Sequence, residues 1–223
     1  MFIFVLIGLL ILAFAAFVYM QDGSEFTKLT NYSSFDLLSN KEARKLNSMY
    51  KALSKVDGEH RILLNVHVQA GATVHKIPAV LLHESGIHLI TTVERGGWII
   101  GSDRSIDWVN VLYKNKQETF ENPILVNRRS LYALRDVMPE VPEQAFHSIV
   151  LFNDGCSFQK VEITADYVEV LKQKELAGWA GRLAEENLTV DEIQKVYDML
   201  KDKMVFHKKF VTKKQAKRNK QVA

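Results

Sequence analysis

The alternation of apolar and polar residues predicts a helix followed by a series of β-strands in the first half of the chain. Residues 40–53 place their apolar side chains on one helical face, and Ser39 and Glu42 have the spacing of a capping box. Strand-like runs separated by glycine-containing turns follow at residues 61–70, 76–83 and 87–93. Gly96 and Gly97 then predict a hairpin turn into a fourth short strand at residues 98–101.

The second half of the chain alternates helices and strands. A helix is expected from Pro123, because proline suits the first position of a helix. Thr189 and Glu192 form a second capping box at the start of a last helix. Two strands and one short helix are expected between them, at residues 148–152, 167–171 and 174–186. The element order predicts an α/β sandwich around one mixed central sheet.

The N-terminal segment is apolar enough to cross a membrane. Residues 2–20 form a run of 19 residues without a charge, and at about 1.5 Å per residue this run matches a hydrocarbon core of roughly 30 Å. A cleaved signal peptide is the alternative, since residues 13–15 resemble a small-residue cleavage site. The missing basic segment and the continuing apolar run favour a retained single-pass anchor at residues 1–21.

The charges beside the anchor predict its orientation. No basic side chain precedes the apolar run, whereas Lys28 and Lys41 follow it. The positive-inside rule then places the C-terminal part of the chain in the cytoplasm, at the cell membrane. Residues 22–34 are polar and are expected to form a linker to a globular domain at residues 35–200.

A basic tail follows the domain. Residues 201–223 contain nine Lys or Arg and one Asp, a net charge of +8, whereas the whole chain carries +3. Such a tail is expected to be disordered and suits solubility, or contact with anionic lipid or nucleic-acid phosphate; beside a membrane, lipid ranks first. The side chains expected to make this contact are Lys208, Lys209, Lys213, Lys214, Lys217, Arg218 and Lys220.

Few other residues suggest chemistry. Cys156 is the single cysteine, so it forms no internal disulfide and is interpreted as an incidental thiol. The sequence has no phosphate-binding glycine loop followed by Lys and Ser or Thr, and no Gly-x-Ser-x-Gly motif. His83 and His88 are metal-ligand residue types, but no third ligand keeps a regular spacing with them.

Residues 40–200 resemble the NERD (nuclease-related) domain of bacterial and plant proteins. The resemblance is carried by "IPAVLLHESGIHLITTVERGGWIIGS", by Trp108 with "VLYKNKQETFENPI", by Asn127 and by "YAL" at residues 132–134. It implies a restriction-endonuclease-like fold and Mg²⁺-dependent cleavage of nucleic acid. In the family, an Asp on one strand and Glu-x-Lys on the next strand surround the metal and the attacking water.

The chain departs from this pattern at the family's catalytic positions. Pro78 stands at the Asp position, Thr91 at the Glu position and Val93 at the Lys position. Val126 replaces the helical Gln, and Glu42 alone retains an early helical Glu, which can equally serve to cap its helix.

A rearranged site has weak candidates in the sequence. Glu94 is shifted by one residue and points to the opposite strand face, and Glu84 lies in a turn. Glu94 and Arg95 are interpreted as a surface pair. The sequence therefore predicts a membrane-anchored binding or scaffold module without metal or cofactor, whose partner is a protein or nucleic acid. The alternative is an active nuclease with a rearranged metal site.

Overall fold

The computed structural model describes residues 6–10, 12–14, 16, 24–184 and 186–205. Its chain divides into two compact units, residues 1–44 with 206–223 and residues 45–205. Most of the predicted anchor, and all seven basic side chains expected to contact lipid or nucleic acid, lie outside the described residues. Among the described residues, no helix has both the length and the apolar character that a membrane span requires.

The segment expected to be a linker contains a helix. α2 (Glu25–Thr30) begins after Ser24, whose hydroxyl accepts a hydrogen bond from the backbone N–H of Thr27 at 3.3 Å. It ends at Asn31, which adopts the left-handed conformation with φ of 62°. These two local caps explain why a polar segment becomes helical here.

A short helix also changes the predicted start of the following one. α3 (Ser34–Ser39) directly precedes α4 (Lys41–Leu53), and Asn40 separates them. The Asn40 side chain accepts hydrogen bonds from the N–H groups of Glu42 (2.8 Å) and Ala43 (3.3 Å). The predicted capping box is therefore wrong: Ser39 belongs to α3, and its hydroxyl donates to the carbonyl of Phe35.

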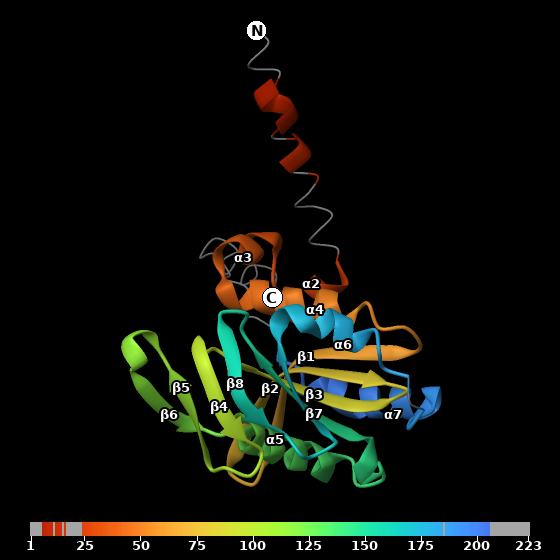
Figure 1. The fold of residues 1–223 in the computed structure, drawn as a ribbon. Helices are drawn as coiled ribbons and strands as arrows, with labels where there is room; N and C mark the ends of the chain where they lie inside the picture. The colour runs from red at the N-terminus through yellow and green to blue at the C-terminus, as the bar shows by residue number, and fades with distance from the viewer. Residues whose placement is uncertain (1–5, 11, 15, 17–23, 185, 206–223) are drawn as a thin grey trace. The chain divides into compact units, whose positions relative to one another are not determined.

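The second unit contains two mixed sheets in place of the single central sheet that the sequence predicted (Figure 1). Sheet A has five strands in the order β1-β2-β3-β7-β9. Its strands are β1 (His60–Ala70), β2 (Thr73–His83), β3 (Gly86–Val93), β7 (Phe146–Phe152) and β9 (Val168–Lys172). The first three are antiparallel neighbours, whereas β3, β7 and β9 run parallel.

Sheet B has four strands in the order β6-β5-β4-β8. Its strands are β4 (Gly97–Ser102), β5 (Asp107–Val111), β6 (Gln117–Glu121) and β8 (Cys156–Glu162). β4 is antiparallel to β5 and parallel to β8. The sequence predicted β4 and missed the other three strands.

Gly96 and Gly97 do not form the predicted hairpin turn, because β4 pairs with β5 and β8 and not with β3. These glycines lead the chain from sheet A into sheet B. Gly97 has φ of +81°, and its N–H donates to the carbonyl of Gly155 at 3.2 Å. A Cβ at Gly97 would collide with the carbonyl oxygen of Val111, so the change of sheet depends on glycine here.

Helices contact sheet A. α5 (Pro123–Val137) contacts β1, β2, β3 and β7, and α7 (Val190–Leu200) contacts β1 and β2. Pro123 at the start of α5 and the Thr189–Glu192 capping box of α7 are confirmed. The helix expected at residues 174–186 is shorter, because α6 covers only Leu176–Ala180. The 3-10 helices are η1 (Tyr113–Asn115), η2 (Glu143–Ala145), η3 (Gln173–Glu175) and η4 (Lys201–Lys203).

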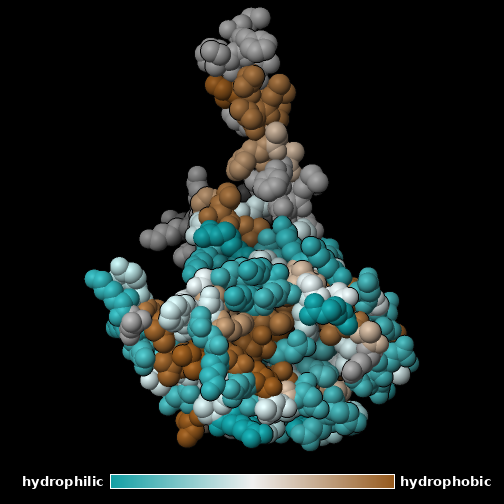
Figure 2. All heavy atoms as spheres, in the orientation of Figure 1, coloured by the Kyte–Doolittle hydropathy of each residue, from teal (hydrophilic) through white to brown (hydrophobic). Residues whose placement is uncertain are grey.

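An apolar cluster lies between the two sheets. Trp108 of sheet B stacks on Phe152 of sheet A with ring centroids 6.0 Å apart, and Ile124 of α5 packs with them. Cys156 is buried in the same cluster, and this burial raises the pKa of its thiol. Figure 2 shows apolar side chains reaching the surface in the region of β4 and β8, with hydrophilic side chains around them.

Candidate functional site

Three of the positions singled out by the family resemblance lie on one face of sheet A. Ala79 of β2 pairs with Ile90 of β3, and continuing this antiparallel register brings Pro78 opposite Thr91. Val93 follows Thr91 by two residues, so both side chains point to the same side of the strand. The structure thus gathers the positions that the resemblance assigned to one metal site.

This face belongs to the core between the sheets. In the parallel register, Thr91 pairs with Val150 and Val93 pairs with Phe152. Val150 and Phe152 are buried members of the apolar cluster, and Val93 packs against it. The surroundings of Val93 are therefore apolar, which disfavours a charged group at this point.

Two buried asparagines connect the start of α5 to the sheets by hydrogen bonds. Asn122 accepts from the N–H of Ile124 and donates from Nδ2 to the carbonyls of Ser102 (3.1 Å) and Ser105 (2.6 Å). Asn127 donates to the hydroxyl of Ser148 at 2.8 Å. Both asparagines position the helix through hydrogen bonds, while the neighbouring Val126 is exposed.

Charged side chains surround the end of β3 without forming the predicted Glu94–Arg95 pair. Glu94 forms an ion pair with Lys45 at 2.6 Å. Arg95 lies 3.5 Å from Glu118 and covers the ring of Phe120 at 4.7 Å. The prediction was wrong: both residues follow the end of β3, and each pairs with a residue of a different element.

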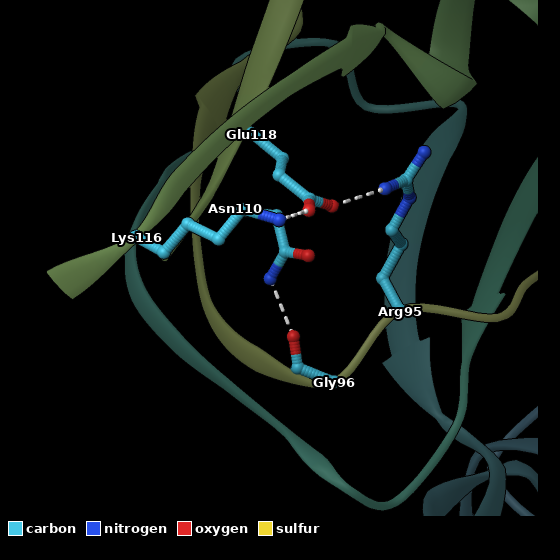
Figure 3. A network of polar contacts seen from close by, with 5 residues as sticks. All are labelled: Arg95, Gly96, Asn110, Lys116 and Glu118. Atoms are coloured by element: carbon cyan, nitrogen blue, oxygen red, sulfur yellow. Dashed lines mark hydrogen bonds and ion pairs between the residues drawn. The ribbon is translucent and has the colours of Figure 1, made fainter. Parts of the chain in front are cut away.

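Glu118 is held between two cations (Figure 3). Lys116 lies 2.8 Å from one of its oxygens, and Arg95 approaches the other. The hydrogen bond and charge of Lys116, followed by the charge of Arg95, lower the pKa of Glu118, and Glu118 in turn raises the pKa of Lys116. In the same view the Asn110 side chain donates to the carbonyl of Gly96.

The Glu118 cluster offers too few oxygen atoms for a metal site of the kind that the family resemblance implies. Glu118 is a single carboxylate whose charge is already balanced, whereas Mg²⁺ favours several oxygen ligands. Across the described part of the chain, no three His, Cys, Asp or Glu side chains are grouped to hold a metal ion. Glu84, in the turn after β2, uses its backbone carbonyl to accept from the N–H groups of Asn187 and Leu188.

A buried chain of hydrogen bonds connects the two histidines of the β2–β3 turn. The Ser85 hydroxyl lies 2.8 Å from His83 Nδ1 and 2.8 Å from His88 Nε2. His83 Nε2 lies 2.9 Å from the carbonyl of Asp57. All three side chains are buried, so the two histidines and the serine form a local hydrogen-bond network.

The His88 ring has aromatic neighbours on two sides. It stacks on His147 at 4.7 Å, and Trp179 approaches it edge-on at 5.2 Å. Burial, followed by the positive charges that His147 and His83 could carry, holds the pKa of His88 well below its ordinary value. His88 is therefore neutral at physiological pH.

Comparison with known proteins agrees with the resemblance seen in the sequence. The family model for the nuclease-related domain, NERD, matches residues 40–153. The chain belongs to the NERD family. An uncharacterized protein of Bacillus anthracis is 25% identical to it over 150 residues, which are 66% of this chain and 69% of that protein. No solved structure matches the chain.

In this NERD-family chain, the residues named from the sequence fall into separate places. Pro78, Thr91 and Val93 share one strand face, whereas Glu42 is an exposed residue in the first turn of α4, within the other unit. The Ser85 bridge between His83 and His88 was missed. The spacing of these residues around the Ser85-Gly86 turn was the available signal, because a tight turn brings its flanking side chains together.

Proposed function

We propose that this NERD-family protein is a binding module that does not hydrolyse nucleic acid with a metal ion. The observation that carries the proposal is the packing of Val93, at the family's Lys position, against the apolar cluster of Val150 and Phe152. An apolar side chain that packs in the core, Val93, thus stands where the family has a charged Lys beside the attacking water.

The residues present do not suit Mg²⁺. Thr91 offers a neutral hydroxyl in place of a carboxylate, and Pro78 offers no side-chain ligand. A metal-dependent nuclease needs these groups together, because the metal polarises the phosphate and generates the hydroxide. Loss of several such groups removes more catalysis than partial substitution can restore.

We place this module on a restriction-endonuclease-like scaffold, which the two mixed sheets support. We further propose that residues 1–21 anchor it in the cell membrane with the C-terminal part in the cytoplasm. The uncharged run at residues 2–20 and the basic residues that follow it support this topology. The basic tail would contact anionic lipid, and the partner held at the membrane is a protein or nucleic acid.

The first test is a cleavage assay on the full chain in detergent. Single- and double-stranded DNA and RNA are incubated with Mg²⁺ or Mn²⁺, and we expect no cleavage above the level of a chelator control. Cleavage that survives purification and disappears in Glu84→Ala or Glu118→Gln would instead support a nuclease with a rearranged site.

The second test concerns topology. A reporter that is active only outside the cytoplasm is fused to the C-terminus, and we expect it to stay inactive. A second fusion, to a reporter active only inside, serves as the matched control and should give signal. An active external reporter, or a mature chain that begins within residues 14–19, would contradict the anchored orientation.

A further inference from the structure

A pocket of about 560 Å³ lies beside the first residues of β7, which precede the point where β7 starts to pair with β9. The pairing of these strands starts at Ser148 and Val168, so the two preceding residues of β7 have no partner in β9. Those residues, Phe146 and His147, line the pocket. Its volume lies within the range of roughly 300–1,000 Å³ that is typical of small-molecule sites.

Three of the other segments that line the pocket supply most of its charged side chains. α5 contributes side chains at the spacing of one helical face: Arg128, Leu131, Tyr132 and Arg135. The residues around the start of β9 contribute Asp166, Tyr167 and Glu169. The segment after α6 contributes Arg182 and Asn187. The lining therefore combines guanidinium groups, carboxylates and aromatic rings.

Several of these charges are already balanced. Arg135 pairs with Glu143 at 2.7 Å, and its guanidinium lies within 6 Å of two rings, at 5.8 Å from Tyr132 and 5.9 Å from Phe146. Glu169 accepts a hydrogen bond from the indole N–H of Trp179 at 2.8 Å. Arg128 and Arg182, in contrast, form no side-chain hydrogen bond or ion pair with any residue that the structure describes.

The hydrogen bonds on the polar side of the pocket determine which ring nitrogen of His88 carries its proton. The Asp57 carbonyl can only accept, so His83 Nε2 carries a proton, and His83 Nδ1 is an acceptor because the backbone N–H of Ser85 donates to it at 3.0 Å. Ser85 then donates its hydroxyl proton to His83, and His88 Nε2 donates to Ser85. Nδ1 of His88 is left as an unprotonated acceptor, buried and without a hydrogen-bond partner among the described residues.

A buried acceptor without a partner is costly, and a bound group or an ordered water normally satisfies it. Because Ser85 and His88 both line the pocket, this network is continuous with the surface that a ligand would contact. A ligand donor that reached His88 would complete the chain of hydrogen bonds. This observation is independent of the charges on the walls.

We propose that this pocket binds a nucleotide. Two arginines without protein partners suit the bidentate recognition of a phosphate. Asp166 and Glu169 would repel a simple anion, but they can accept hydrogen bonds from sugar hydroxyls. The rings of Tyr132, Phe146 and Tyr167 suit a flat base. A nucleoside monophosphate carries all three groups, and so does the phosphorylated end of a strand.

This inference does not depend on the proposed loss of metal-dependent hydrolysis. Pro78, Thr91 and Val93 are not part of the pocket lining. A chain that binds nucleotide and also cleaves nucleic acid would contradict the proposed function alone. A chain that does neither would contradict the pocket assignment alone.

The test is titration calorimetry of the full chain in detergent with defined probes. The four nucleoside monophosphates are compared with the corresponding nucleosides, with ribose 5-phosphate and with inorganic phosphate. We expect at least one monophosphate to bind about tenfold more tightly than its nucleoside and than ribose 5-phosphate, because each of these lacks one recognised group. A 5′-phosphorylated trinucleotide that binds more tightly still would identify a strand end as the source.

Variants of three arginines test the assignment, with Arg129 as the control. Arg128→Gln and Arg182→Gln should each weaken monophosphate binding by about tenfold or more, since each removes a charge-assisted contact. Arg129→Gln should leave it unchanged, because Arg129 is exposed, pairs with Glu121 and does not line the pocket. Circular dichroism confirms that each variant is folded.

Two results would overturn the assignment. The first is the absence of binding by every monophosphate and by the trinucleotide. The second is equal affinity for inorganic phosphate and for all monophosphates, or equal weakening by Arg128→Gln and Arg129→Gln, since either pattern indicates attraction by general surface charge.

Discussion

The two faces of β3 have become different environments. Thr91 and Val93 lie beside Val150 and Phe152 of β7, on the face that carries the apolar cluster between the sheets. His88 points to the other face, where it stacks on His147 and joins the hydrogen bonds of Ser85. One face therefore stabilises the fold by excluding water, and the other contributes polar groups to a pocket.

This difference is what we expect if one face of a NERD-family scaffold can change without the other. Strand side chains alternate between faces, so a change on one face leaves the spacing of the other intact. Filling the Thr91–Val93 face with apolar neighbours does not disturb the His83–Ser85–His88 turn. The following predictions test whether the two faces are as separate as this comparison implies.

The largest effect is expected from Trp108→Ala. Trp108 is fully buried and stacks on Phe152, so its removal leaves a cavity in the cluster and should cost about 3–5 kcal/mol of unfolding free energy. Trp98→Ala is the matched control, because Trp98 is 51% exposed and its loss should cost less than about 1 kcal/mol. Urea unfolding followed by circular dichroism measures both. Equal costs would mean that the two sheets do not share a core.

Val93→Lys should give the next largest effect. The variant restores the family's Lys but places an unpaired charge against apolar neighbours, and we expect a loss of about 1–3 kcal/mol. Val93→Leu keeps the apolar character at larger size and serves as the control in the same urea titration. If Val93→Lys is as stable as the control, this face is open to water and the comparison of the two faces fails.

The pH dependence of stability tests the polar face. The folded state holds the pKa of His88 well below 6.5, so the unfolded chain binds a proton first as the pH falls. The contribution of His88 to the unfolding free energy should be constant above pH 6.5. Below pH 6.5 it should decrease by up to about 1.4 kcal/mol per pH unit, until the pKa of the folded state is reached. Unfolding at several pH values measures the slope.

His88→Gln is the comparison for the pH experiment. Its unfolding free energy should vary less steeply than that of the natural chain below pH 6.5, because one proton-binding group of the unfolded state is removed. Identical slopes would show that His88 is accessible to protons in the folded state.

The smallest effect is expected from Glu118→Gln. Its ion pairs with Arg95 and Lys116 are solvent-accessible and therefore screened by water and salt. We expect no resolvable change in the thermal midpoint at low or high salt. A large shift would indicate that the cluster in Figure 3 is part of the core and not a surface network.

The sequence predicted the strands of sheet A and β4, and it missed β5, β6 and β8 of sheet B. β1, β2, β3 and β7 each contain several buried apolar residues. β6 (Gln117–Glu121) alternates exposed and half-buried residues, and β8 exposes several polar side chains, so their composition resembles that of loops. The change of sheet at Gly97 was not predictable, because local sequence does not reveal which strands pair.

The candidate site could be predicted only in part from the sequence, because it combines residues that lie far apart in the chain. The resemblance identified Pro78, Thr91 and Val93, but the packing of Val93 against the apolar cluster depends on β4, β5 and β7, which lie elsewhere in the chain. The pocket depends on residues from α5, β7 and the segment after α6. His88 and His147 are 59 positions apart, and only the parallel register of β3 and β7 brings them together.

That register also determines the order in which the chain can fold as it leaves the ribosome. β1, β2 and β3 are consecutive and can pair as soon as they are synthesised, but the free edge of β3 must wait for β7 (Phe146–Phe152). All of β4, β5 and β6 is synthesised in this interval. An uncovered apolar edge can pair with another chain. Nascent chains stalled before Phe146 should therefore aggregate or require a chaperone, whereas chains that extend past Phe152 should not.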